Sequence, residues 1–269
     1  GIAIEFTWIL QTLFYLTVYG FYKYSITKSS QSDFLNLIWR GASTGIFAVA
    51  VYIAIDLFYR SLGESKLATE PFLMTFFYHV RFGLLTIFLI STSLLWQHLI
   101  LYQKTKRVVK QWQAYEIALL VSMFLVFFDR GINEYSFFFG LVLLGILAAI
   151  LSTNLKWIPY LTFKEKWKSL LFLSVIIASV GYFLWYTFSE EKDYTYQANL
   201  TWNLFIVSIF WFVLIYAVLG FLVTLFNLPT SSVFEQKLTE AINFQRLSQS
   251  IQPEESEEEV LDILMDSCM

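Results

Sequence analysis

Residues 200–226 read LTWNLFIVSIFWFVLIYAVLGFLVTLF, a stretch without a charged residue or a proline. An α-helix needs about 20 mostly apolar residues to cross a hydrocarbon layer of about 30 Å. This stretch is long enough to do so and therefore predicts a membrane-spanning helix.

Six further stretches are similarly apolar. They are residues 1–22, 35–57, 82–102, 115–128, 135–153 and 168–188. All four prolines lie outside the seven stretches, and the stretches lack the ten-residue alternation of barrel strands. We therefore expect an all-α fold, a polytopic membrane helix bundle of seven spans over residues 1–226. Because the chain starts apolar and without methionine, we expect it to be a fragment, and one more helix upstream would give eight spans.

The composition excludes several other classes of protein. Of the 269 residues, 57% are apolar and 14% are charged, and the mean hydropathy is +0.60. Soluble domains carry about 25% charged residues, so a soluble globule and a disordered chain are both excluded. The single cysteine, Cys268, excludes an internal disulfide framework.

Charge is unevenly distributed and predicts the orientation in the membrane. Loops 23–34, 103–114 and 154–168 hold ten lysines and arginines, whereas the three alternate loops hold five. Lysine and arginine accumulate in cytoplasmic loops, so these loops are predicted to lie inside, where they would also attract anionic lipids. Residues 227–269 carry a net charge of −7 and would also be cytoplasmic, which fits a multi-pass protein of the bacterial inner membrane.

The region after the last span predicts a signalling helix. Asn227–Ser232 combine helix-stopping and capping residues, and Ser232 with Glu235 forms a capping box. We expect a break there, then a cytoplasmic linker helix in a domain of residues 227–252. The residues predicted to transmit a signal are Ser232, Phe234, Leu238 and Ala241.

The spacing of apolar residues in this linker favours a short coiled coil. Phe234, Leu238 and Ala241 follow 4/3 spacing, which is the heptad pattern of helices that pair. A homodimer is therefore a candidate assembly. Residues 253–269 would begin a truncated cytoplasmic domain, with a second helix that starts near Ser256.

The last segment resembles a known junction. Residues 226–269, FNLPTSSVFEQKLTEAINFQRLSQSIQPEESEEEVLDILMDSCM, look like the connection between a membrane domain and a GAF domain in bacterial signalling proteins. The run is most similar to membrane-bound GAF proteins that end in a SpoIIE-like, PPM-type serine/threonine phosphatase, and next to sensor histidine kinases. The resemblance implies an output domain downstream of Met269, and it assigns no catalytic residue to this chain.

Ionisable residues near one predicted end of the bundle form a candidate ligand site. Such residues are costly within a span and mark functional sites. Asp56 and Arg60 are spaced to pair on one helix, and other charged residues lie near the outer ends of their spans. The candidate ligand-binding residues are Asp56, Arg60, His79, Arg81, Asp129 and Arg130. They predict an outward-facing cup for a small anionic ligand or a lipid headgroup; the alternative is an ordinary interfacial belt with one structural ion pair.

Other chemistry has no motif in the sequence. His79 and His98 are the only histidines, and the chain has neither a phosphate-binding glycine loop nor a dinucleotide fingerprint. The last span contains no lysine that could hold retinal. No cofactor, metal or nucleic acid is expected.

Three classes of function stay open from the sequence. The first is a receptor module that passes a stimulus through its last span to a cytoplasmic output domain. The second is a small transporter or channel, whose spans tend to be repeated and interrupted near the midplane. The third is an intramembrane enzyme. No span holds a proline, and Gly41, Gly45, Gly140 and Gly145 are predicted to be helix-packing sites, which favours the receptor.

Overall fold

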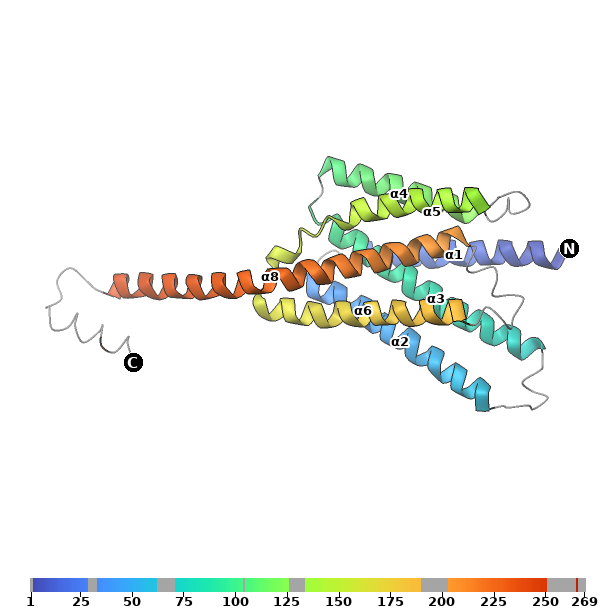
Figure 1. Ribbon diagram of the computed structural model, residues 1–269, viewed down its shortest axis with the longest axis horizontal. Coiled ribbons are helices and arrows are strands. Elements are labelled where there is room, and N and C mark those ends of the chain that lie inside the picture. Colours follow the sequence, from blue (N-terminus) through green and yellow to red (C-terminus); the bar gives the residue numbers. More distant parts are fainter. Residues whose placement is uncertain are drawn as a thin grey trace. The chain divides into compact units, whose positions relative to one another are not determined.

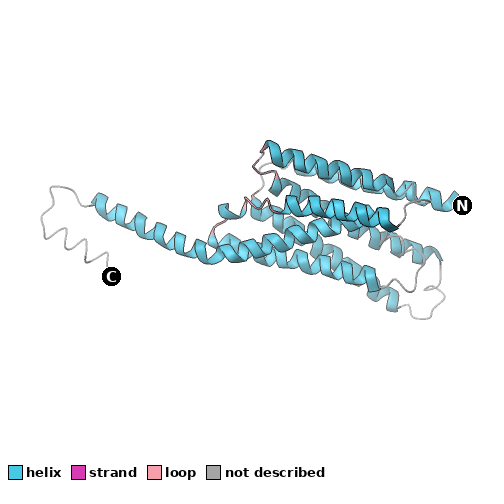
Figure 2. Cartoon of the chain, turned by 45° about the horizontal axis from the view of Figure 1, so that its top comes forward, coloured by secondary structure: helices cyan, strands magenta, loops and turns pink. Residues whose placement is uncertain are grey.

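The computed structural model describes residues 2–28, 33–61, 71–103, 105–125, 134–189, 203–250 and 265. Within these ranges the chain forms helices joined by turns, and no strand occurs (Figure 2). The helices are α1 (Ile2–Lys28), α2 (Phe34–Ser61), α3 (Pro71–Ile100), α4 (Lys106–Leu125), α5 (Glu134–Ser152), the 3₁₀ turn η2 (Ile158–Tyr160), α6 (Phe163–Ser189) and α8 (Leu204–Ser250).

Among the described residues, five helical stretches are long and apolar enough to cross a membrane. They are Phe34–Ser61, His79–Ile100, Tyr135–Ser152, Phe163–Tyr186 and Leu204–Leu228. The chain is thus an all-helical, multi-pass membrane protein, as the sequence predicted. The two other predicted spans fall on α1 and α4, and the count of seven stays a prediction.

The chain divides into two units, Gly1–Leu225 and Phe226–Met269. Within the first unit, α2 packs against α3 and α6, α1 packs against α3, and α4 packs against α5. Figure 1 shows α4 beside α5 and α6 beside α2. Because α2 contacts both α3 and α6, these three helices can bring side chains together at either end.

The first half of α8 is buried among five other helices. Phe205 lies 4.9 Å from the ring of Tyr15 in α1, Phe212 lies 5.0 Å from Tyr115 in α4, and Tyr216 lies 4.9 Å from Trp96 in α3. Leu204 lies against Gly140 of α5, and Gly220 against Leu173 of α6. A shift of α8 therefore requires these neighbours to repack.

A buried hydrogen bond fixes α8 to the turn before α6. The indole nitrogen Nε1 of Trp157 donates to the hydroxyl of Tyr216 at 2.9 Å, and both side chains are fully buried. A polar atom in such a place costs free energy unless it is hydrogen-bonded. The bond therefore favours the position of α8 in which Tyr216 faces Trp157.

Both α6 and α8 begin at side-chain caps. The Thr162 backbone N–H donates to the Glu165 carboxylate at 2.9 Å, which is half of a capping box at the start of α6. The Ile206 backbone N–H donates to Asn203 Oδ1 at 3.2 Å, so Asn203 caps α8. These caps fix where the two helices start.

Three of the four predicted packing glycines lie in close contacts between helices. A Cβ atom added at Gly45 would lie 2.8 Å from Ser179 Oγ, and one at Gly140 would lie 2.8 Å from Leu204 Cδ2. At Gly41 it would lie 3.3 Å from Ile176 Cδ1. The prediction was wrong for Gly145, where no atom of the described residues lies within 4 Å of an added Cβ atom.

The predicted helix break at 227–232 does not occur, because α8 continues through it to Ser250. Proline removes one backbone donor, and the helix on both sides of Pro229 keeps its own hydrogen bonds, so the helix is not ended. Ser232 and Glu235 consequently lie within α8 instead of capping a new helix. The residues that follow Ser250, including the predicted second helix from Ser256, lie outside the described residues apart from Met265, so the predicted helix end near Ser250 stays a prediction.

The close approach at Gly45 leads to a stability prediction. We expect Gly45→Ala to lower the melting temperature of the purified protein, because overpacking against Ser179 and Phe88 costs about 1–3 kcal/mol. Gly145→Ala is the matched control. The added methyl group has open space at Gly145, and alanine is a better helix former than glycine, so this variant should leave the melting temperature unchanged or raise it. Equal effects of the two variants would contradict the packing of α2.

Candidate functional site

The carboxylate of Asp56 joins three helices near one end of the bundle. Arg81 Nη2 on α3 lies 3.1 Å from Asp56 Oδ1, and Arg60 Nε lies 2.8 Å from Oδ2. The Tyr186 hydroxyl on α6 donates to Oδ1 at 2.9 Å. We call Asp56, Arg60, Arg81, Tyr186 and Tyr52 the Asp56 cluster.

Two aromatic rings hold the guanidinium of Arg81. Its Cζ lies 5.0 Å from the ring centre of Tyr52 and 5.4 Å from that of Tyr186. The two rings contact each other edge to face at 4.6 Å. A cation over an aromatic face is attracted by the ring quadrupole, most strongly where water is excluded, so Arg81 is held in one orientation by charge and by packing.

The cluster arises from simple helix geometry. Tyr52, Asp56 and Arg60 follow each other at i, i+4 spacing and share one face of α2. That face meets α6 and α3 because Gly45, two turns earlier than Tyr52, permits their close approach. The close packing of α2 on α3 and α6 therefore places Asp56 beside Arg81 and Tyr186.

The two arginines differ in their access to solvent. The side chain of Arg60 is 71% exposed, whereas those of Asp56 and Arg81 are each 16% exposed. With two cationic groups and one anionic group, the cluster has a formal charge of +1. Arg60 can thus contact a dissolved or lipid-borne anion, while Arg81 positions the carboxylate.

Only part of the predicted cup is brought together. Asp56, Arg60 and Arg81 meet as predicted. His79 is exposed on α3, and at two residues from Arg81 it points to a different face of the helix. Asp129 and Arg130 lie outside the described residues.

Sequence reasoning missed the two tyrosines of the cluster. Tyr52 could have been found, because it lies four residues before Asp56 on the same helix face. Tyr186 gives no such signal, since its contact with Asp56 depends on how α6 packs on α2.

A second polar cluster, which the sequence did not reveal, joins α1 to α4. The Glu116 carboxylate accepts hydrogen bonds from Lys23 and from the Tyr19 hydroxyl, and Trp112 Nε1 donates to it at 3.1 Å. The sequence pattern that could have indicated this cluster is a glutamate inside one predicted span and a lysine at the end of another. Three donors satisfy the charge, so this cluster is a structural link between the helices.

The predicted transmission residues lie on one helix. Ser232, Phe234, Leu238 and Ala241 all belong to α8. Leu238 and Ala241 are exposed, and Ile242 and Phe244 beside them are also exposed apolar residues. Exposed apolar side chains at this spacing are available to a partner helix.

In the part of the chain that the structure describes, no group of three or more His, Cys, Asp or Glu side chains is arranged to hold a metal ion.

Comparison with known proteins identifies no relative, since no family model, curated protein or solved structure matches the chain.

The unequal burial of the two arginines yields a prediction. Asp56→Ala removes the carboxylate that pairs with the mostly buried Arg81, and we expect the free energy of unfolding to fall by about 3 kcal/mol. Arg60→Ala removes an exposed partner and should cost less than about 1 kcal/mol. Melting temperatures in detergent give the comparison. If Arg60→Ala proved the more damaging variant, Arg81 would not be the buried partner of Asp56.

Proposed function

We propose that this protein is a membrane sensor module that relays a stimulus through α8 to a cytoplasmic output domain. One observation carries the proposal: a single helix of 47 residues contains both the buried contacts of Phe205, Phe212 and Tyr216 and the exposed residues near Leu238. At about 1.5 Å per residue, such a helix is about 70 Å long. It connects rearrangement inside the bundle with a site far along the chain.

The Asp56 cluster is the proposed input site. Its positive formal charge and the exposed Arg60 suit a small anion or an anionic lipid headgroup. An anion that pairs with the arginines would compete with Asp56. The two relevant states are the one with Asp56 paired to Arg81 and the one with Asp56 released from it. A ligand shifts an equilibrium only by its differential affinity for two states, so the anion must bind the released state more tightly.

Two helices connect this cluster with α8. Arg81 lies on α3, whose Trp96 contacts Tyr216 of α8. Tyr186 lies on α6, whose Leu173 lies against Gly220 of α8. Loss of the Asp56 contacts would free α3 and α6 to move at one end, and both helices contact α8 at the other.

We further propose a seven-span topology in the bacterial inner membrane, with residues 227–269 in the cytoplasm. Support comes from the lysine-rich loops and the acidic C-terminal segment. The output domain would be a GAF domain followed by a PPM-type serine/threonine phosphatase, for which the resemblance of residues 226–269 is the support. A sensor histidine kinase is the second candidate, and exposed Leu238 and Ala241 would support a homodimer in either case.

Insertion of residues into α8 tests the relay. One alanine inserted after Gln245 in the full-length protein rotates the following residues by about 100°, and we expect it to change the basal output activity at least several-fold. The assay is phosphate release from a phosphoserine peptide by isolated membranes, with autophosphorylation measured in parallel. A seven-residue insertion returns the helix to within about 20° of its original phase and should restore the output. Unchanged output from both insertions would mean that α8 is a passive tether.

Thermal shifts test the input site. We expect at least one of a panel of small carboxylates and phosphate esters to raise the melting temperature of the purified protein, since a ligand stabilises the state that it binds. Arg60→Gln and Arg81→Gln should each lower the apparent affinity, obtained from the dependence of the melting temperature on ligand concentration, at least tenfold. Arg107→Gln removes an exposed arginine of α4 and should keep the shift. A response that survives in Arg60→Gln and Arg81→Gln would refute the assignment of the site.

A further inference from the structure

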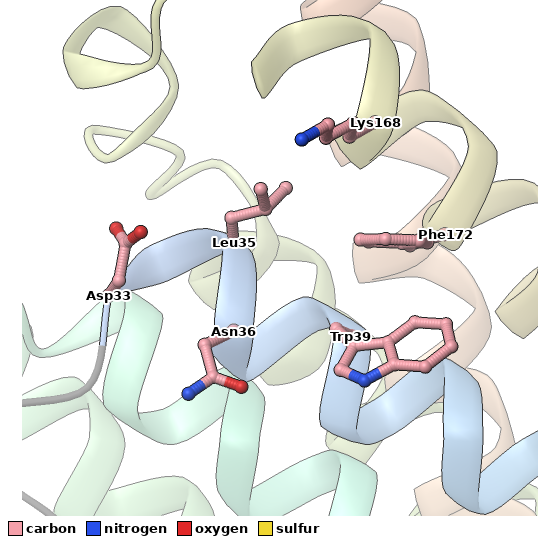
Figure 3. Close-up of a pocket in the computed structure, with 6 residues that line it drawn as sticks. All are labelled: Asp33, Leu35, Asn36, Trp39, Lys168 and Phe172. Carbon is pink, nitrogen blue, oxygen red and sulfur yellow. The ribbon is translucent and has the colours of Figure 1, made fainter. Parts of the chain in front are cut away.

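A groove lies between the first turns of α2 and α6, at the end of these helices away from the Asp56 cluster. Its volume is about 550 Å³, which is within the usual size of small-molecule sites. The lining residues, drawn in Figure 3, are Asp33, Leu35, Asn36, Trp39, Lys168 and Phe172.

The rim of the groove carries one positive and one negative charge. Asp33 directly precedes α2 and Lys168 lies in the second turn of α6, and both side chains are exposed. Figure 3 shows them on either side of Leu35. They form no ion pair with each other or with another described residue, so both charges are available to a ligand that spans the groove.

The deeper part of the groove is aromatic. Trp39 follows Leu35 by one turn of α2, and Phe172 follows Lys168 by one turn of α6. Their ring centres are 4.9 Å apart, and the Trp39 side chain is 45% exposed. Along both helices the lining thus changes from charged to apolar in the same direction.

This gradient matches a molecule that is itself polar at one end and apolar at the other. Trp39 with its polar indole N–H suits the level where headgroups meet acyl chains, because tryptophan concentrates at that interface. Two of the lining residues, Asp33 and Lys168, belong to the sequence loops 23–34 and 154–168, which are lysine-rich and predicted to face the cytoplasm. These features suit a lipid of the predicted cytoplasmic leaflet better than a free solute.

We propose that the α2–α6 groove binds an aminophospholipid of the phosphatidylethanolamine class. The Lys168 ammonium would pair with the lipid phosphate, the Asp33 carboxylate would accept from the primary ammonium group, and the glycerol and acyl chains would lie on Trp39 and Phe172. A lipid with only negative charge, such as phosphatidylglycerol, leaves Asp33 without a cationic partner and is repelled by it. A choline headgroup offers no N–H to Asp33.

Lipid binding to the purified full chain tests this proposal. Native mass spectrometry in detergent, with phosphatidylethanolamine, phosphatidylglycerol or phosphatidylcholine titrated in turn, gives apparent affinities for each. We expect the wild type to retain phosphatidylethanolamine best. Lys168→Gln should weaken retention of both the ethanolamine and the glycerol lipid about tenfold, since it removes one charge-assisted hydrogen bond. Soluble phosphoethanolamine should compete poorly because it lacks the acyl chains.

The Asp33→Asn variant provides the sharper readout. Without the carboxylate, repulsion of phosphatidylglycerol disappears and attraction of the ammonium group is lost, so the preference should shift about tenfold or more toward the glycerol lipid. Lys164→Gln removes an exposed lysine one turn before Lys168 that does not line the groove, and it should behave as wild type. These variants change exposed side chains, and helical circular dichroism checks that they fold.

Two results would overturn the proposal. One is equal retention of ethanolamine and glycerol lipids by the wild type, and the other is an unchanged lipid preference in Asp33→Asn. Neither readout involves signal output, so failure here leaves the proposed sensor function standing, and the reverse also holds.

Discussion

The burial of α8 among α1, α3, α4, α5 and α6 is the constraint on which the rest of the bundle depends. In a bilayer, apolar surface gives helices no preference for each other over lipid, so close packing and hydrogen bonds decide the arrangement. Tyr216 meets both needs, because its ring contacts that of Trp96 and its hydroxyl accepts a hydrogen bond from the Trp157 indole. The first half of α8 consequently has side-chain contacts with five other helices, and the proposed relay rests on these contacts.

The α2–α6 pair provides the second organising element. Trp39 contacts Phe172 near the start of both helices, and Tyr186 contacts Asp56 near the end of both, so the two helices run in the same direction. Gly45, against Ser179, lies between these contacts and permits the close approach. The contact between α2 and α6 thus has the charged Asp56 cluster near one end and the amphipathic groove near the other. A stimulus at the cluster and a lipid in the groove would act on the same pair of helices.

Prediction from sequence succeeded where single-helix properties decide the outcome. Hydropathy located the five described stretches that are long and apolar enough to cross a membrane, and i, i+4 spacing paired Asp56 with Arg60. It failed where contacts between helices decide. The partnership of Tyr186 with Asp56, the satisfaction of Glu116 by Lys23, and the open surroundings of Gly145 all depend on packing that no local pattern encodes. The continuation of α8 through Pro229 shows a further limit, because stop signals are only preferences and a long helix can continue through them.

Labelling of single cysteines in intact cells tests the relay most directly. In a Cys268→Ser background, Arg60→Cys and Leu238→Cys each place one thiol at an exposed position, the first at the Asp56 cluster and the second on the distal part of α8. We predict that a membrane-impermeant maleimide modifies Arg60→Cys in intact cells and modifies Leu238→Cys only after permeabilisation. Modification of Leu238→Cys from outside, or of both positions from the same side, would contradict the transmission of an external stimulus through α8 to the cytoplasm.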